Sequence, residues 1–170
     1  MATFKRPSLG QRAKLGTLYD AREDAFLTES LMTGDIPEDA ITSVPLDQSK
    51  SSVGTSASLK EKFEKLGIGN ELITSFLAGM VEPKGSAKYL TQKRDALPVV
   101  HRALYHTVTT RQETIHFSKS SLTSLLDLSS LSACSATHVV SGITWGGRTI
   151  VAARQYLPPG ADRAKYEANG

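Results

Sequence analysis

Apolar and polar residues alternate along the stretch from residue 136 to residue 154. Read as a strand, this stretch places four apolar side chains on one face: Val139, Ile143, Trp145 and Val151. The opposite face carries His138, Thr144, Arg148 and Arg154. Two adjacent glycines, Gly146 and Gly147, interrupt the pattern, and paired glycines in a strand permit a bulge or a sharp bend. The pattern therefore predicts one long, half-buried strand with a bend at these glycines.

Two further segments have the composition of strands. Residues 99–117 contain neither Gly nor Pro and are rich in β-branched residues, which favours a strand over a helix despite the length. Both faces of this strand are mixed in polarity, which indicates an edge strand or a partly uncovered one. Residues 14–22 also alternate, with Leu15, Thr17, Tyr19 and Ala21 on one side. We expect a first strand there.

Between these strands the apolar residues change to a helical spacing. Ser58 followed by Glu61 has the spacing of a capping box, so the first helix is expected to start after Ser58. Its apolar face consists of Leu59, Phe63 and Leu66. Its other face is charged and consists of Lys60, Glu61, Lys62, Glu64 and Lys65.

A second amphipathic helix follows the break at residues 67–69. Asn70 is the predicted cap of this helix. Its apolar stripe consists of Leu72, Ile73, Phe76, Leu77 and Met80. Pro83 and Gly85 end it, and a short helical turn is predicted over residues 86–90. Short amphipathic helices of this kind need a surface on which to bury their apolar faces.

The remaining segments have the composition of loops. Residues 1–12 predict a loose arm. From residue 28 to residue 56 the chain is rich in Ser, Thr, Asp, Pro and Gly, so we expect only short strands near residues 40–44 and a linker over residues 47–58. Within residues 118–135, one helical turn is predicted from three apolar residues, Leu122, Leu125 and Leu126.

Length and composition place limits on the fold. A chain of 170 residues suits one domain, predicted over residues 1–157, with a polar C-terminal tail over residues 158–170. Its hydrophobic content of 39% and aromatic content of 6% are modest for a packed globule, which indicates an extended or incomplete unit. The formal net charge of +3 gives no strong field for nucleic acid, so no nucleic-acid partner is expected.

The N-terminus and the single cysteine bear on location. Lone Cys134 excludes an intrachain disulfide and fits either a reducing compartment or indifference to redox state. We find no signal-peptide pattern and no apolar run near the roughly 18 residues of a membrane-spanning helix, so a cytoplasmic or non-classically secreted protein is expected. The basic residues at the start are expected on a solvated face: Lys5, Arg6, Arg12 and Lys14.

The sequence contains no recognisable catalytic, cofactor or metal constellation. On one strand, His106 and His116 would lie about 33 Å apart, so they cannot share a metal ion. Cys134 near His138 is more typical of ordinary packing than of a nucleophile. Glycine-rich phosphate loops and nucleophile elbows are absent from the sequence. We therefore expect no catalytic residue, no cofactor, no metal and no enzymatic activity.

Several blocks resemble the N-terminal segment of the stonustoxin and verrucotoxin family, which consists of fish-venom cytolysins and their relatives. The first block is Leu-Gly-x-x-x-x-Leu-Gly-x-Leu-Tyr-Asp-Ala-Arg over residues 9–22. Three more follow in the family's order: Phe-Leu-Ala-Gly-Met-Val-Glu from Phe76, Gly-Ser-Ala-Lys-Tyr-Leu from Gly85, and Ala-Thr-His-Val-Val from Ala136. Together they cover about a third of the chain.

This resemblance implies a fold similar to the membrane attack complex/perforin and cholesterol-dependent cytolysin domains. The expected fold class is α+β: a bent, twisted antiparallel sheet of long strands flanked by a cluster of short amphipathic helices. By position, residues 58–90 resemble the first helical cluster, which in pore-forming members unfurls into membrane-spanning hairpins. The chain is predicted to be partial, since the second cluster, the last sheet strand and the domains that follow in the full toxins have no counterpart.

Two functions from different classes stay open. The first is a pore-forming-toxin-like domain that acts by oligomerisation and membrane interaction, and that is not lytic alone in this short form. The second is a non-lytic interaction module that pairs through exposed sheet edges. The expected partners are a lipid membrane and a second copy or a partner protein. The predicted membrane-insertion residues are Leu59, Phe63, Leu66, Leu72, Ile73, Phe76, Leu77 and Met80, and the predicted bend residues are Gly146 and Gly147.

Overall fold

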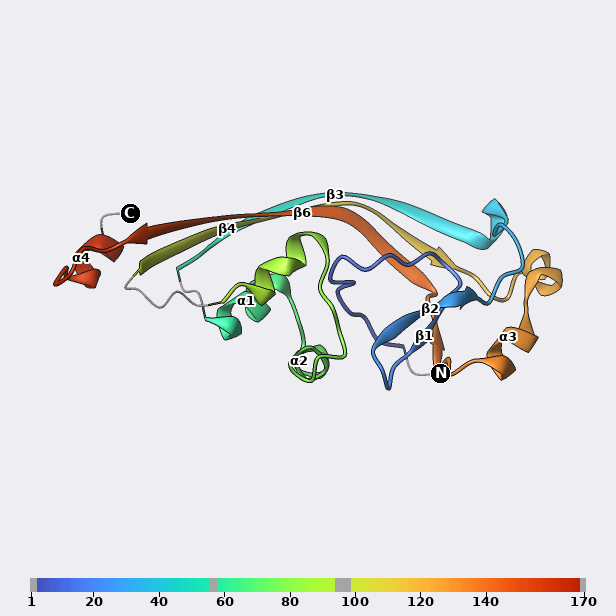
Figure 1. Cartoon of the computed structure of the whole chain (residues 1–170). Helices are drawn as coiled ribbons and strands as arrows, with labels where there is room; N and C mark the ends of the chain where they lie inside the picture. The colour runs from blue at the N-terminus through green and yellow to red at the C-terminus, as the bar shows by residue number, and fades with distance from the viewer. Residues whose placement is uncertain (1–2, 56–57, 94–98, 169–170) are drawn as a thin grey trace.

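Three long antiparallel strands form a sheet that arches over the rest of the chain (Figure 1). The computed structural model describes residues 3–55, 58–93 and 99–168. In the order of the sheet the strands are β3 (Ile41–Gly54), β4 (Val99–Ile115) and β6 (Gly142–Tyr156). The strand predicted over residues 99–117 is therefore present. It lies at the centre, so its interpretation as an edge strand is wrong, whereas a partly uncovered face is confirmed by Leu104, which is 44% exposed.

The prediction of a linker over residues 47–58 is wrong for residues 47–54, because residues 41–54 form one strand of 14 residues; residues 56–57 of the predicted linker lie outside the described part. Most residues of β3 are exposed, so its sequence lacks the apolar alternation by which strands are recognised. Its order comes from backbone pairing with β4, from Ile41 opposite Ile115 to Gly54 opposite Ala103. Pro45 is tolerated since β3 is an edge strand and the pairing is irregular there.

The pairing irregularities of the arch lie in one line across the sheet. Between β3 and β4 the register shifts between Pro45 and Gln48. Between β4 and β6 it shifts between Thr109 and Arg111, opposite Gly146. Bulges increase the local twist and bend a strand, so their alignment lets all three strands bend together.

The two glycines predicted at the bend have different surroundings. A Cβ atom added to Gly146 would lie 2.0 Å from the carbonyl oxygen of Val108, so β4 approaches too closely for any side chain. A Cβ atom on Gly147 would meet nothing within 4 Å. The close approach of the two backbones thus requires glycine at position 146 alone.

The bend also changes which side chains of β6 face inward. Before it, Ile143 and Trp145 are half-buried; after it, Arg148 and Ile150 are half-buried, whereas Val151 is 59% exposed. The predicted face that grouped Val151 with Ile143 and Trp145 is therefore wrong. The physical reason is the one-residue shift in register at Gly146, which moves every later side chain to the other face.

A second, small sheet lies under one end of the arch. Its order is β2 (Ala25–Ser30), β1 (Thr17–Asp20) and β5 (His138–Val139). The strand predicted over residues 14–22 is present as β1, although three successive residues are buried rather than every second one. The single strand predicted over residues 136–154 is wrong: β5 and β6 belong to different sheets, because the chain leaves the small sheet after Val139.

The N-terminal arm is packed rather than loose. Leu9 is 3% exposed, and the Arg6 side chain is 12% exposed beside Asp24. The prediction of a solvated face is therefore wrong for Arg6, and it is confirmed for Lys5, Arg12 and Lys14, which are exposed. The sequence could not reveal this because the partners of the arm come from distant segments.

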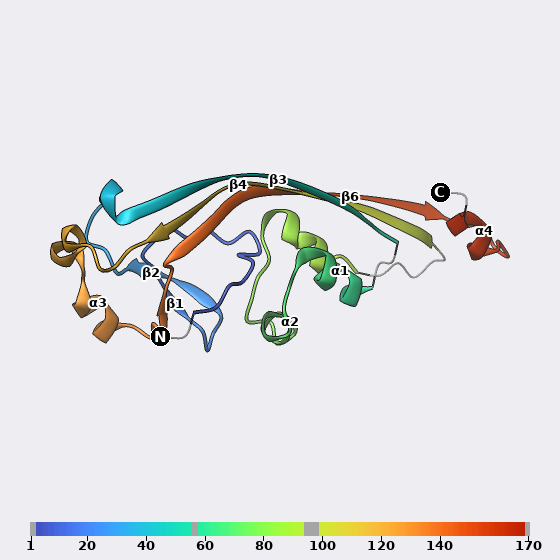
Figure 2. The same cartoon turned by 180° about the vertical axis from the view of Figure 1, so that it is seen from behind.

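The helical cluster and the small sheet both lie on the concave side of the arch, as the view from behind also shows (Figure 2). Each contributes to its own hydrophobic core. The small-sheet core includes Leu18, Ala40, Ile115 and Leu122 and is bordered by short helices. These are η1 (Glu38–Ala40), η3 (Ser120–Leu125), which contains the turn predicted from Leu122, and α3 (Leu128–Ala133). In the predicted tail, α4 (Arg163–Ala168) forms, and residues 169–170 lie outside the described part. The second core, called the helical-cluster core, includes Phe63, Leu66 and Leu72.

Candidate functional site

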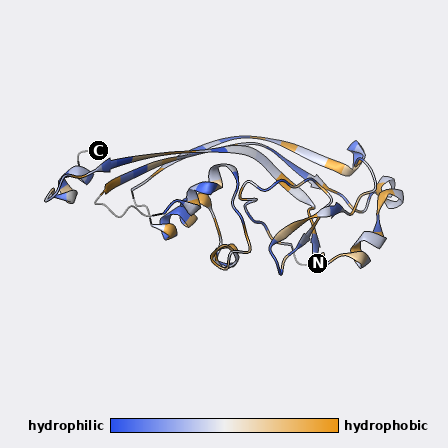
Figure 3. Cartoon of the chain, viewed as in Figure 1, coloured by the Kyte–Doolittle hydropathy of each residue, from blue (hydrophilic) through white to orange (hydrophobic). Residues whose placement is uncertain are grey.

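The helical cluster consists of α1 (Leu59–Leu66), α2 (Asn70–Leu77) and η2 (Gly85–Thr91). Figure 3 shows apolar residues gathered on α1 and α2, beneath strands whose middle is mostly hydrophilic or neutral. The cluster packs on the concave side of the sheet through Ala103 and Tyr105 of β4 and Ile150 of β6. This is the segment that the sequence predicted as the membrane-insertion element.

Helix α1 follows its sequence signals closely. The amide of Glu61 donates to the Ser58 hydroxyl at 3.3 Å, as the capping-box spacing predicted. The helix ends at Gly67, whose φ of 66° is the left-handed conformation of a glycine C-cap. Leu66 and Phe63 are 1% and 5% exposed, so the predicted apolar face is the buried face.

Helix α2 lies against α1 through an aromatic pair. The rings of Phe63 and Phe76 meet edge to face with centroids 5.6 Å apart, and Leu72 is 4% exposed. The N-cap is Gly69, so the prediction of Asn70 as the cap is wrong. Gly69 has the extended backbone of a cap residue, whereas Asn70 already belongs to the helix.

The eight predicted insertion residues divide into two groups. Six belong to the helical-cluster core or pack against it: Leu59, Phe63, Leu66, Leu72, Ile73 and Phe76. The other two, Leu77 and Met80, are 63% and 40% exposed. Leu77 is the last residue of α2 and Met80 follows the helix, so the cluster presents an apolar tip to solvent.

Lys62 is a buried tie inside the cluster, so its prediction on the charged, exposed face is wrong. Its side-chain ammonium donates to the carbonyl oxygens of Tyr89 at 3.0 Å and Gln92 at 3.2 Å, and it lies 4.4 Å from the centre of the Tyr89 ring. Burial, and secondly the positive charge of Arg154, lowers the pKa of Lys62. The tie joins α1 to η2.

A row of polar rings holds η2 on the sheet, and the sequence interpretation missed it. The Tyr89 hydroxyl lies 3.0 Å from Nε2 of His101, which is 3% exposed. The rings of Tyr89 and Tyr105 meet edge to face at 5.9 Å, and burial raises the pKa of Tyr105. The spacing of His101, Ala103 and Tyr105 along one strand face was a visible signal, but only the fold brings Tyr89 to it.

The cluster also closes against the end of β3. The carboxylate of Glu61 accepts from the amide of Thr55 at 2.9 Å. A Cβ atom on Gly54 would lie 2.8 Å from the same carboxylate and 2.9 Å from the Tyr105 ring. Gly54, the last residue of β3, therefore lets the helix approach the strand end.

Within the described ranges, the structure holds no group of three or more potential metal-ligating side chains. Over the same ranges, it holds no helix that is both long enough and apolar enough to cross a membrane. In the part of the chain that the structure describes, short amphipathic helices rest on a bent sheet.

An arched antiparallel sheet with a short-helix cluster on its concave side is the architecture that the sequence blocks implied. The family described as the SNTX, MACPF/CDC-like domain matches residues 3–163, so the chain belongs to the SNTX family of MACPF/CDC-like domains. The solved stonustoxin structure has the same fold: its TM-score is 0.66 at 24% identity, over 96% of this chain and 20% of that chain. The predicted family and fold class are confirmed.

Curated relatives are fish toxins. Cytolytic toxin-beta of Scorpaena plumieri is 31% identical over 147 residues, which is 82% of this chain and 20% of the toxin. Stonustoxin subunit beta of Synanceia horrida has the same identity and coverage, and stonustoxin subunit alpha is 30% identical over 148 residues. The chain thus spans about a fifth of the length of these relatives. The relationship to pore-forming toxins is established, and the alternative of a sheet-edge interaction module is not favoured.

Proposed function

We propose that this chain interacts with membranes through its helical cluster and assembles there with further copies or a related subunit, without enzymatic activity. The family relationship supports this proposal, and so do the relatives, whose names distinguish alpha and beta subunits. The exposed tip of Leu77 and Met80 is the part of the cluster that first meets a lipid surface.

One observation carries the proposal: the segment that contains the cluster is the entire connection between β3 and β4, which are neighbouring strands of the sheet. Strands β3 and β4 pair up to Gly54 and Ala103, and residues 55–98 then join them. Antiparallel neighbours need only about 2–5 connecting residues. If the segment unfolded, each half, roughly 20 residues of strand at about 3.3 Å per residue, would exceed the ~30 Å core of a bilayer.

The charges of the segment oppose lysis by this chain alone. A membrane-spanning hairpin needs alternating apolar residues that face lipid, and α1 does not alternate in this way. Its charged residues are Lys60, Glu61, Lys62, Glu64 and Lys65. We therefore propose docking and assembly without perforation.

The test is co-sedimentation with vesicles of mixed neutral and anionic lipid, with dye release measured on the same vesicles. The double variant Leu77→Ser/Met80→Ser should lower the fraction bound roughly tenfold, because two apolar side chains can no longer enter the lipid. Leu128→Ser is the matched control, since Leu128 is 64% exposed on another short helix. An equal loss of binding in the control would place the contact elsewhere. Absence of binding by the unmodified chain would refute the proposal.

A further inference from the structure

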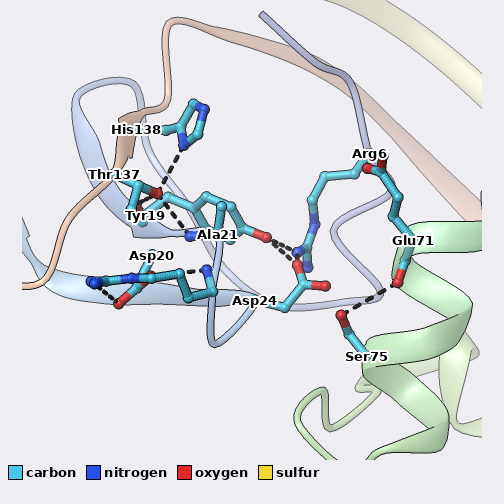
Figure 4. Close-up of polar contacts among 10 residues, drawn as sticks. Arg6, Tyr19, Asp20, Ala21, Asp24, Glu71, Ser75, Thr137 and His138 are labelled. Carbon is cyan, nitrogen blue, oxygen red and sulfur yellow. Dashed lines mark hydrogen bonds and ion pairs between the residues drawn. The ribbon is translucent and has the colours of Figure 1, made fainter. Parts of the chain in front are cut away.

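The N-terminal arm, residues 3–14, has one anchor on the small sheet. The guanidinium of Arg6 forms an ion pair with Asp24 and lies 5.0 Å and 5.5 Å from the ring centres of Tyr19 and Phe26. Asp24 also accepts from the Tyr19 hydroxyl. Figure 4 shows the Arg6 side chain pointing toward Tyr19 and Asp24, which belong to the β1–β2 hairpin.

The second anchor of the same arm lies in the helical cluster. Leu9 is part of the helical-cluster core, and its carbonyl accepts from the amide of Lys84 at 2.7 Å. Next to it, Gly10 has a φ of 78°, and a Cβ atom there would lie 2.2 Å from the Lys84 carbonyl oxygen. The arm therefore packs backbone to backbone against the segment between α2 and η2.

Backbone strain is present at both anchors. Among the residues that the structure describes, those other than glycine with a positive φ are Leu9, at 50°, and Asp24, at 54°. This conformation is unfavourable for a side chain with a Cβ atom and persists only where surrounding contacts hold it. The contacts around Leu9 are those that join the arm to the cluster, whereas Asp24 lies in the turn of the β1–β2 hairpin, where aspartate adopts this conformation more readily.

We propose that the N-terminal arm is a latch that keeps the helical cluster closed on the sheet and must release before the cluster can leave it. Figures 1 and 2 both show the arm running between the cluster and the small sheet. Departure of the cluster breaks the Lys84–Leu9 hydrogen bond and removes Leu9 from the core. Loss of the Arg6 anchor frees the outer end of the arm and so weakens its hold on Leu9. The inference rests on the proposed function, in which the cluster is the part that meets the membrane, and adds that the cluster leaves the sheet.

The test is amide hydrogen exchange of the full chain in solution, without membranes. In the Arg6→Met variant, the amides of residues 59–77 should exchange roughly tenfold faster, while the amides of β4 keep their exchange rates. The reason is that Arg6 is anchored on the small sheet, so its loss can affect the cluster only by loosening the arm. Arg22→Met is the matched control. Arg22 pairs with Asp20 of β1 at 2.9 Å but donates its other bond to the Ser135 carbonyl oxygen, so its removal should leave residues 59–77 unchanged.

Unchanged exchange over residues 59–77 in Arg6→Met, or an equal acceleration in β4, would overturn the latch. If Arg6→Met does not fold, the double variant Arg6→Met/Asp24→Asn removes both charges, and asparagine tolerates the positive φ of position 24. For this double variant too, unchanged exchange over residues 59–77 or an equal acceleration in β4 would overturn the latch. Since no membrane is present, faster exchange over residues 59–77 supports the latch even if the vesicle assay refutes the proposed function.

Discussion

The two ends of the arched sheet are covered in different ways. At one end the helical cluster comes from a single continuous segment, residues 58–91. At the other end the small sheet joins three segments from distant parts of the chain, with β1 between β2 and β5. A continuous segment can leave a surface as a unit, whereas interleaved strands separate only when their backbone hydrogen bonds break.

The two ends also differ in the kind of hydrogen bond that holds them. In the small sheet they join backbone to backbone: Thr137 donates to Tyr19 and Val140 to Thr17, both at 2.9 Å. Under the helical cluster the side chain of Lys62 ties α1 to η2, and the side chain of Tyr89 ties η2 to the sheet at His101. The backbone bond from Lys84 to Leu9 joins the cluster to the N-terminal arm and not to the sheet. The small-sheet end is therefore held by backbone pairing between distant segments, whereas the helical end is one continuous segment, which is the part that the proposed latch would release.

The largest expected effect comes from truncating one fully buried leucine at each end. Leu66 and Leu18 are 1% and 0% exposed, so Leu66→Ala and Leu18→Ala should each lower the free energy of unfolding by about 2–5 kcal/mol. The two variants should differ in which amides lose protection from hydrogen exchange. By hydrogen exchange, Leu66→Ala should expose mainly residues 59–91, and Leu18→Ala the whole chain. If both variants gave the same exchange pattern, the two ends would form one cooperative unit and the comparison would fail.

A smaller effect is expected at the bend between the two ends. Gly146→Val should lower the free energy of unfolding by about 1–3 kcal/mol, because its side chain would meet the Val108 carbonyl oxygen. Gly147→Val is the matched control and should leave the melting temperature nearly unchanged, since a Cβ atom there meets nothing within 4 Å. Equal melting temperatures for the two variants would show that the strands separate without cost at the bend.

The smallest effect is expected from acid at the small-sheet end. Hydrogen bonds, first from the Ser129 hydroxyl and then from Ser130, lower the pKa of Asp127 from 3.8 to about 2. A carboxylate with a lowered folded-state pKa stabilises the fold above its unfolded pKa, and this stabilisation is lost as the pH falls through the folded value. Amides of α3 should therefore lose exchange protection between pH 3.8 and about 2.

Asp127→Asn provides the control for the acid experiment. Asparagine keeps an oxygen that can cap α3 but does not ionise, so the loss of α3 protection with acid should disappear. The variant should leave α1 as it was at every pH, because Asp127 caps a helix at the opposite end of the arch. A persisting acid transition in α3 would assign the effect to another group.

Some elements could be predicted because their signals are local. Helix α1 carries its cap, its apolar face and its glycine stop within residues 58–67, and the structure confirms all three. Strand β4 is recognisable from its β-branched composition alone. The position of the irregularity in β6 was visible as a glycine pair, although only the approach of Val108 distinguishes Gly146 from Gly147.

Other elements depend on partners distant in sequence. Strand β3 has an exposed, polar sequence and exists because β4 supplies its hydrogen bonds. Lys62 resembled every other charged residue of α1 until the carbonyl oxygens of η2 were placed beside it. The sequence also could not predict which side chains of β6 face inward after the bend. That depends on the register shift, which is a property of the pairing between β4 and β6.

The sequence by itself determined the family, the fold class and the helical cluster, because these rest on local patterns and on blocks in a fixed order. Tertiary structure alone decided that the strand over residues 136–154 divides between two sheets, that β3 extends the arch, and that the N-terminal arm packs on the helical-cluster core and on the β1–β2 hairpin. The physical reason is common to all three. Backbone pairing and buried ion pairs are formed by residues far apart in the chain, and nothing in either partner's own sequence specifies the other.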